Sequence, residues 1–365
     1  MKKFLALFLA LSCVISITGC SEQDKKFVET LRPVQTNTST STSTVDLKFN
    51  YKEFEKIVDD IESYKIPADG EEYYSEESLN DELEQSKLVD KDGNISVSMI
   101  SNTKSDPTKN YADGDISLSV GSVSLKLGNV YVRGNDIYYS REYLLNSLTL
   151  GGLLVGSNDT ESLNEIDELK NNVNKALNGK KYIKVSSGVN PGTGNIVSNY
   201  ALNTRKEKQI DDFLTIFKDF NSLSVKETEN GATFELNSDN YSAFITRTCE
   251  YLRARKDSYE QLLVLKVQTI DESDAFLWMQ LFALVNNQSF NNFMETAGLK
   301  FTVNDTVGKT DDTNYTDTIE GVFGKDGNDP IGTLTAKTEY TLTDNVTFEN
   351  IDESVDYMDV MLSLL

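Results

Sequence analysis

Between residues 95 and 139, apolar and polar residues alternate with a period of two, and no other feature of the chain constrains its fold more. Successive side chains of a strand point to opposite faces, so this pattern predicts strands with one buried and one solvated face. The break at Gly121-Ser122 predicts a bulge or a tight turn, and Gly134-Asn135 predicts the turn of a hairpin. We therefore expect an antiparallel meander. Its apolar positions are Ile95, Val97, Met99, Ile116, Leu118, Val120, Val123, Leu125, Leu127, Val130, Val132, Ile137 and Tyr139.

Helical spacing and further alternation predict the remaining elements of an α+β fold. A strand is expected at 182–185, a hairpin turns at Asn230-Gly231, and Ser140 is expected to cap a helix. Residues 275–285 are apolar on nearly every side but too few to span a bilayer, which predicts a buried helix. Other helices are predicted at 50–64, 140–150, 163–177, 210–220, 244–252 and 355–361, and other strands at 301–307, 315–323 and 331–342.

The first twenty residues have the three parts of a secretory signal peptide. Lys2 and Lys3 precede an apolar run over 4–17, and Ile17-Thr18-Gly19-Cys20 closes it. These four residues resemble the bacterial lipobox, which implies that residues 1–19 are removed and that Cys20 is acylated. We expect an extracytoplasmic protein anchored by lipid to the cell membrane, or to an outer membrane if the cell has one. Residues 20–46, rich in Ser and Thr, are expected to be a flexible tether with a reach of about 28 Å.

Composition narrows the classes of function. The chain has 58 acidic and 35 basic residues, a formal charge of −23, which disfavours nucleic acid as a partner. It has no His, the commonest general base and transition-metal ligand. We therefore expect no enzyme, metal or cofactor, and Cys249 alone cannot form an internal disulfide. Asp90–Asn94 and Gly308–Thr310 lack the residues that an EF-hand or a phosphate loop requires, so a turn is expected at the former.

The segments SLSVGSVSLKLGNVYVRGNDIYYSREYLLNSL and KKYIKVSS are similar in rhythm to lipoproteins with the LolA-like fold, which include lipoprotein carriers and glycolipid carriers. The resemblance covers residues 50–365 and is best over 112–186. It implies that residues 47–365 form one domain with a helical insertion, in which a curved antiparallel sheet, a half-barrel, packs on amphipathic and apolar helices. Several members of that family hold acyl chains between sheet and helices.

Five aromatic residues provide more apolar surface than one helix needs: Phe276, Trp278, Phe282, Phe290 and Phe293. They are either ordinary core or part of the lining of a cavity for a lipid or another apolar ligand. The leading hypothesis is a non-catalytic binding module. The alternative is a structural or interaction lipoprotein that displays an acidic surface to envelope partners, which the sequence does not identify. A transporter solute receptor would need a parallel sheet, which this pattern disfavours.

Overall fold

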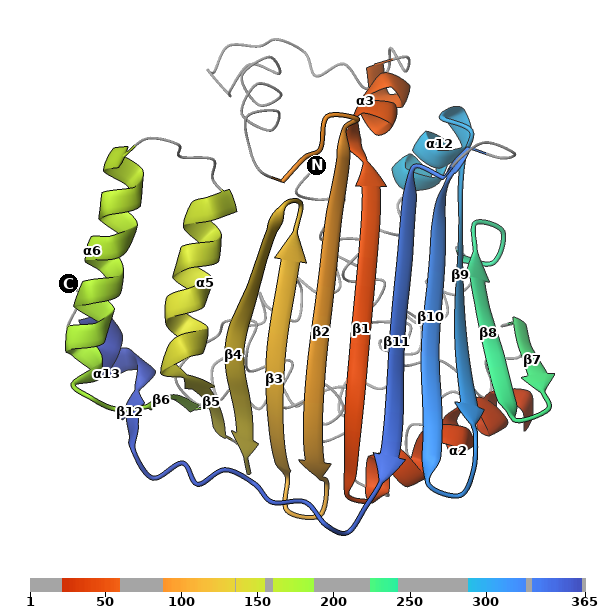
Figure 1. Cartoon of the computed structure of the whole chain (residues 1–365). Helices are drawn as coiled ribbons and strands as arrows, with labels where there is room; N and C mark the ends of the chain where they lie inside the picture. Colours follow the sequence, from red (N-terminus) through yellow and green to blue (C-terminus); the bar gives the residue numbers. More distant parts are fainter. Residues whose placement is uncertain are drawn as a thin grey trace.

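The computed structural model describes residues 22–59, 88–134, 136–154, 160–186, 224–241, 288–325 and 330–362. These residues form an α+β fold with one large open sheet of 12 strands and with helices at its ends and on one face (Figure 1). The order across the sheet is β12-β6-β5-β4-β3-β2-β1-β11-β10-β9-β8-β7. All neighbouring strands are antiparallel except β12 and β6, which are parallel. The sheet is therefore mixed, whereas the sequence predicted a purely antiparallel one.

The strands form two meanders that meet at β1. The first runs outward from β1 to β6, and the second runs inward from β7 to β11, which pairs with the other edge of β1. The strand bounds are β1 Ser39–Asn50, β2 Asn94–Asp106, β3 Tyr111–Val120, β4 Val123–Arg133, β5 Asp136–Ser140, β6 Tyr182–Ser186, β7 Ser224–Thr228, β8 Gly231–Asn237, β9 Leu299–Lys309, β10 Asn314–Lys325, β11 Gly332–Leu342 and β12 Ser354–Asp356.

The described helices pack at the periphery of the sheet. α2 contacts β7, β8, β9 and β11, α5 contacts β4 and β5, and α6 packs on α5 and α13. Figure 1 shows α3 and α12 together at the upper end of the sheet. The helix bounds are α2 Glu22–Thr36, α3 Tyr51–Asp59, α5 Arg141–Leu154, α6 Thr160–Leu177, α12 Gln288–Thr296 and α13 Tyr357–Leu362.

The prediction of a flexible tether over residues 20–46 is wrong for residues 22–46, which the structure describes. Residues 22–36 form α2, and the Ser- and Thr-rich segment forms the first half of β1, a central strand paired on both edges. Polar side chains are accommodated because their neighbours are polar too. The hydroxyls of Ser39 and Ser105 lie 3.0 Å apart, and those of Ser43 and Thr338 lie 2.9 Å apart. Hydrogen bonding thus replaces apolar contact at this end of the strand.

Most other predicted elements that fall on described residues are confirmed. The turns at Gly121 and Asn230-Gly231 join their predicted strands, and the strands predicted at 301–307, 315–323 and 331–342 correspond to β9, β10 and β11. Ser140 caps α5, because its Oγ accepts a hydrogen bond of 3.1 Å from the backbone N–H of Tyr143. Val355, predicted to be helical, lies in β12. The predicted helices at 210–220, 244–252 and 275–285 lie outside the described residues.

The sheet has two faces with different surroundings. The covered face is the one on which α2 and α5 pack, through contacts such as Phe27 with Phe234, whose ring centroids lie 6.5 Å apart. The open face carries the alternate side chains, including the exposed Thr42, Asp46 and Lys48 of β1. After β11, residues 343–353, here named the C-terminal strap, run along the end of the sheet to β12 (Figure 1).

Candidate functional site

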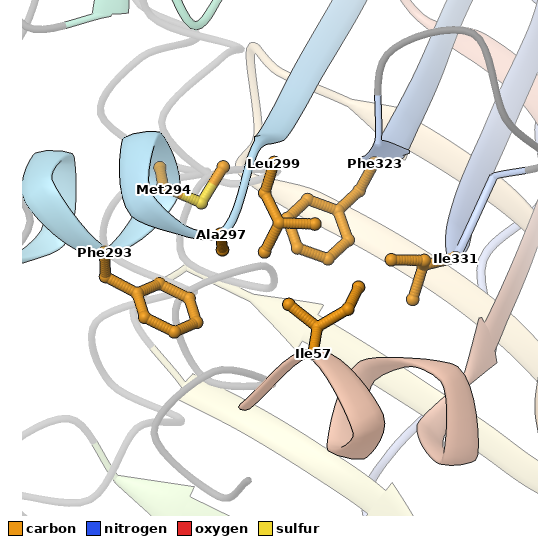
Figure 2. Close-up of a cluster of buried hydrophobic side chains, with 7 residues drawn as sticks. All are labelled: Ile57, Phe293, Met294, Ala297, Leu299, Phe323 and Ile331. Carbon is orange, nitrogen blue, oxygen red and sulfur yellow. The ribbon is translucent and has the colours of Figure 1, made fainter. Parts of the chain in front are cut away.

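The structure describes two of the predicted aromatic residues. Phe290 and Phe293 lie in α12, whereas Cys20, Phe276, Trp278 and Phe282 lie outside the described residues. Phe293 is 6 % exposed and belongs to a packed cluster at the upper end of the sheet (Figure 2). The buried members of this α12 cluster are Ile57, Phe293, Met294, Ala297, Leu299, Phe323 and Ile331.

The α12 cluster joins α3 and α12 to the ends of β9 and β10. Figure 2 shows Ile57 of α3 pointing toward Leu299 and Phe323, with Ile331 beside them. The ring of Phe54 contacts Phe293 at 6.4 Å between centroids in an edge-on arrangement. In this position Phe293 is a core residue, and the predicted lining of a ligand cavity by the five aromatic residues stays a prediction.

The centre of the covered face is less well buried than its flanks. Register pairing aligns Val45 with Met99 and Leu47 with Val97, and Leu118 follows on β3. These five side chains, named the central apolar strip, are all only half-buried. On the flank, Val123, Leu127 and Leu150 pack in a buried cluster beneath α5, and Leu118 at the edge of the strip packs against this cluster. A half-buried apolar strip in the middle of a large sheet leaves apolar surface that an apolar ligand would cover favourably.

The lower part of the covered face is polar and contains a pair of buried carboxyl groups. Asp305 of β9 is 2 % exposed and hydrogen bonds to Asp317 of β10. Burial, followed by the nearby Asp317, raises the pKa of Asp305 well above 3.8, and burial also raises the pKa of Asp317. Among the described residues, Oδ1 of neither carboxyl has a hydrogen-bond donor. A single proton held between them satisfies this pair better than two charges do.

A groove of about 650 Å³ lies on the open face, near the end at which β1 begins. Its floor consists of β11, β1, β2, β3 and β4, and Glu349 of the C-terminal strap contributes to one side. Among the described residues that line it, no side chain is aliphatic. The lining residues are Thr40, Ser41, Thr42, Asn102, Thr103, Lys104, Asp113, Gly114, Asp115, Asn129, Tyr131, Glu339, Thr341 and Glu349.

Hydrogen bonds fix the middle of the groove floor. Thr42 donates to Oδ1 of Asn102 at 3.0 Å, and Nδ2 of Asn102 donates to Asp115 at 3.1 Å. Asp115 also forms an ion pair of 2.6 Å with Lys126. The hydrogen bonds from Lys126 and Asn102 lower the pKa of Asp115, which is therefore ionised at neutral pH. The floor is a preorganised polar surface that spans three strands.

Arg133 attaches the C-terminal strap to the side of the groove. Its guanidinium pairs with Asp113 at 2.6 Å and donates at 2.8 Å to the backbone carbonyl of Glu349. The backbone N–H of Glu349 in turn donates to Asp113 at 2.8 Å. Arg133 also lies over the rings of Tyr111 and Phe348, at 4.9 Å and 5.5 Å from their centroids. These mutual contacts hold the strap as part of the site.

Tyr131 closes one end of the groove and is 7 % exposed. Its ring meets that of Tyr182 edge-on at 5.4 Å, and the Tyr182 hydroxyl donates to Glu349 at 3.0 Å. Burial, with a smaller contribution from Glu349 and Asp113, raises the pKa of Tyr131 to about 12. Its hydroxyl is therefore neutral at physiological pH and available as a donor.

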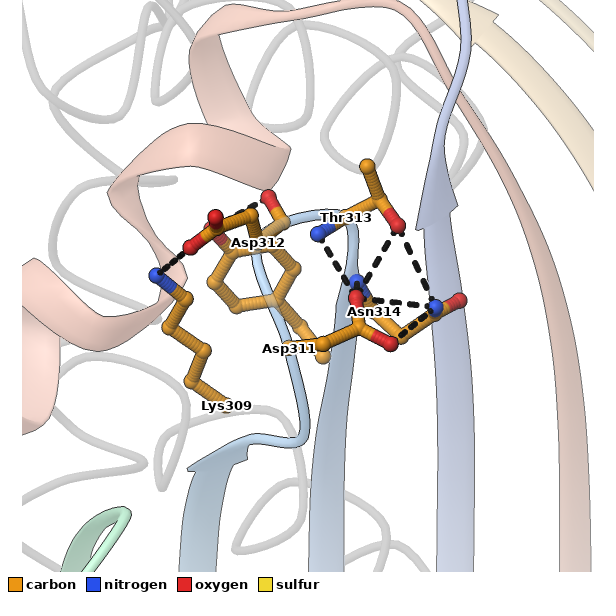
Figure 3. A network of polar contacts seen from close by, with 6 residues as sticks. Lys309, Asp311, Asp312, Thr313 and Asn314 are labelled. Atoms are coloured by element: carbon orange, nitrogen blue, oxygen red, sulfur yellow. Dashed lines mark hydrogen bonds and ion pairs between the residues drawn. The ribbon is translucent and has the colours of Figure 1, made fainter.

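The turn between β9 and β10 carries two adjacent acidic residues, Asp311 and Asp312. Figure 3 shows that its carboxylates serve the turn itself. Asp311 accepts hydrogen bonds from the backbone N–H groups of Thr313 and Asn314, and Lys309 pairs with Asp312 at 2.8 Å. Hydrogen bonds, chiefly from Asn314, lower the pKa of Asp311 to about 2. Within the described ranges, no group of three or more acidic or Cys side chains is placed to hold a metal ion.

The predicted turn at Asp90–Asn94 is confirmed. Oδ1 of Asp90 accepts hydrogen bonds of 2.9 Å from the backbone N–H groups of Asp92 and Asn94, and Gly93 has a φ of 85°. Asp90 therefore stabilises the entry into β2, as expected for an Asx turn.

Comparison with known proteins identifies no relative. No protein-family model, curated protein or solved structure matches the chain. In the part of the chain that the structure describes, no helix has the length and apolar character needed to cross a membrane.

Sequence reasoning missed the groove. Its residues come from five strands and the strap, and no local motif connects them. A signal was present in the polar positions of the predicted strands, where Asn102, Asp113, Asp115 and Asn129 alternate with residues of the covered face. Two strands of the floor, β1 and β11, become neighbours only through the sheet topology.

Proposed function

We propose that this chain is an extracytoplasmic lipoprotein, anchored by lipid on Cys20, whose folded part is a non-catalytic binding module. Its ligand is a lipid or another apolar molecule held between the sheet and the helices, in a LolA-like arrangement with the sheet as a half-barrel. The observation that carries this proposal is the central apolar strip, which lies on the helix-covered face and is only half-buried.

The strip suits an acyl chain for a physical reason. Val45 and Leu47 of β1 continue across the sheet into Val97 and Met99 of β2. Covering apolar surface releases about 25 cal/mol per Å², and an acyl chain gains about 0.8 kcal/mol for each CH₂ that it buries. A lipid-anchored protein also lies next to a membrane, whose lipids contain such acyl chains.

The short connection to the anchor supports a position close to the membrane. α2 begins at Glu22, two residues after Cys20, so the connection between the proposed anchor and α2 is short. The anchor is tested by labelling cells with radioactive palmitate. Label on the intact chain but not on Cys20→Ser supports the anchor, and equal label on both would refute it.

A pair of neighbouring substitutions tests the apolar ligand. Leu47 points to the covered face, and Lys48 points to the open face. The chain from Ser21 onward, exported without its lipid, is analysed by native mass spectrometry and by lipid extraction. We expect copurifying lipid on the unsubstituted chain and on Lys48→Glu, and at least tenfold less on Leu47→Glu. Absence of lipid from all three proteins, each folded, would contradict the proposal.

Two observations support a non-catalytic role. The chain contains no His, so its Ser residues and Cys249 lack the usual general base. The Asp305 and Asp317 pair has the character of an acid dyad, but Asp305 is 2 % exposed. A substrate approaching from solvent would not reach its carboxyl group.

The groove on the open face favours a second candidate function, an interaction lipoprotein that presents this surface to envelope partners. The strap, Asp113 and Arg133 give it defined walls on a preformed floor. Recovery of envelope material by the intact chain but not by a groove variant would support this function. Equal recovery by Lys104→Ala and the intact chain would count against it.

A further inference from the structure

The charge of the groove differs from that of the whole chain. The chain carries a formal charge of −23, yet the acidic side chains of the groove are compensated locally. Asp115 pairs with Lys126 at 2.6 Å, Asp113 with Arg133 at 2.6 Å, and Glu339 with Lys337 at 2.7 Å. The remaining lining acid, Glu349, accepts the Tyr182 hydroxyl, and Lys104 adds a positive charge to the floor. The groove is therefore close to electrically neutral.

Because the groove is close to neutral, it is not expected to bind a strongly charged ligand. A polycation would have to displace Lys126, Arg133 or Lys337 from carboxylates that already hold them, and would lose that energy on binding. A polyanion would meet Lys104 amid four carboxylates. An apolar ligand is disfavoured because the described lining residues include no aliphatic side chain, and their hydrogen-bonding groups would lose water without replacement.

Several hydrogen-bonding groups on the floor remain available. Within the part of the chain that the structure describes, the side chains of Thr40, Lys104 and Asn129 have no hydrogen-bond partner. Thr40 and Lys104 are register partners on adjacent strands, and Asn129 lies on the other side of Asp115. These three side chains provide both hydrogen-bond donors and acceptors. They lie on the sheet around Tyr131 and the hydrogen-bonded residues Thr42, Asn102 and Asp115. The ligand that matches such a surface is neutral and carries many hydroxyl groups.

We propose that the open-face groove binds a neutral glycan chain, whose hydroxyls engage Thr40, Lys104 and Asn129. The proposal rests on the second candidate function and gives its partner a chemical class. The groove volume of about 650 Å³ lies in the range of small-ligand sites, so an oligosaccharide segment fits. The glycan site and the central apolar strip lie on opposite faces of the same sheet, so one chain would contact envelope lipid and envelope carbohydrate at once.

Isothermal titration calorimetry on the full chain in lauryldimethylamine oxide tests the proposal, since this detergent carries no sugar that would compete. The probes are cellotriose, chitotriose and maltotriose, with hexalysine and hexaglutamate as charged comparisons. We expect at least one trisaccharide to bind and neither charged peptide to do so. Lys104→Ala combined with Asn129→Ala should weaken binding roughly tenfold or more, because each lost hydrogen bond contributes about 1 kcal/mol.

Asp46→Ala is the matched control, because Asp46 is exposed on the same face of β1 but does not line the groove. It should bind the trisaccharide as the intact chain does. Lys104→Ala alone, at an exposed position, provides a second variant if the double variant unfolds. Absence of trisaccharide binding, or equal binding by the groove variants, would overturn the proposal. Binding of hexalysine alone would overturn the glycan assignment and leave the interaction function standing.

Discussion

The buried carboxyl pair should lower the free energy of unfolding as the pH rises, and replacing Asp305 with Asn should remove this effect. In the folded chain the pKa of Asp305 is raised well above 3.8 by burial and by Asp317. Above pH 4 the unfolded chain therefore releases a proton that the folded chain retains. The folded state then binds one proton more than the unfolded state, and the free energy of unfolding falls as pH rises.

The size of the effect follows from proton linkage. One retained proton lowers the free energy of unfolding by about 1.4 kcal/mol for each pH unit, until the pH reaches the raised pKa of Asp305. In Asp305→Asn the amide N–H donates to Asp317 in place of the retained proton, at nearly unchanged volume. The variant should therefore gain about 1.4 kcal/mol relative to the unsubstituted chain for each pH unit over this interval.

Urea unfolding at pH 5, 6, 7 and 8 measures this difference. These values lie above the sequence pI of about 4.4, near which the chain would aggregate. Asp311→Asn is the control, because hydrogen bonds lower the pKa of Asp311 to about 2 and it titrates below the measured range. Its difference from the unsubstituted chain should be constant with pH. A constant difference for Asp305→Asn as well would refute the shared-proton interpretation.

Substitutions at four further positions test the packing, and each variant is measured by urea unfolding. Ser140→Ala removes the cap of α5 and should cost about 1 kcal/mol, and retention of the cap by Ser140→Asp would confirm the cause. Gly231→Ala should cost about 1–3 kcal/mol because its Cβ would overlap the carbonyl oxygen of Val307. Gly151→Ala, in open space on α5, should instead stabilise by about 0.5–1 kcal/mol. Phe293→Ala should cost about 3–5 kcal/mol, and a loss below 1 kcal/mol would contradict its role in the α12 cluster.

The predictable part of the fold is the part in which apolar residues alternate with polar ones. Ile116, Leu118 and Val120 specify a strand and its buried face, because a shift by one residue would expose all three. The pairing of β1 with β11 could not be predicted in this way, since the sequence does not show which distant strands become neighbours.

β1 itself was missed because its composition was given more weight than its period. Ser39 to Thr44 alternate Ser with Thr, which is a period of two, and β-branched Thr favours strands. Low hydrophobicity nevertheless predicted disorder. The hydroxyl pairs with Ser105 and Thr338, which offset the missing apolar contact, depend on residues far away in the chain. The groove was missed for the same reason, because its Asn102 network exists only once the strands are in register.

The central position of β1 also determines when the sheet is completed as the chain is synthesised. Ser43 emerges early, but its partner Thr338 follows 295 residues later. Throughout this interval, one edge of β1 is unpaired, and closing so long a loop is slow. An apolar strand with an unpaired edge would pair with strands of other chains and aggregate. Six alternating Ser and Thr residues lack the hydrophobicity that drives such association. The same composition that predicted a flexible spacer thus protects β1 from association with other chains until β11 has been synthesised and pairs with it.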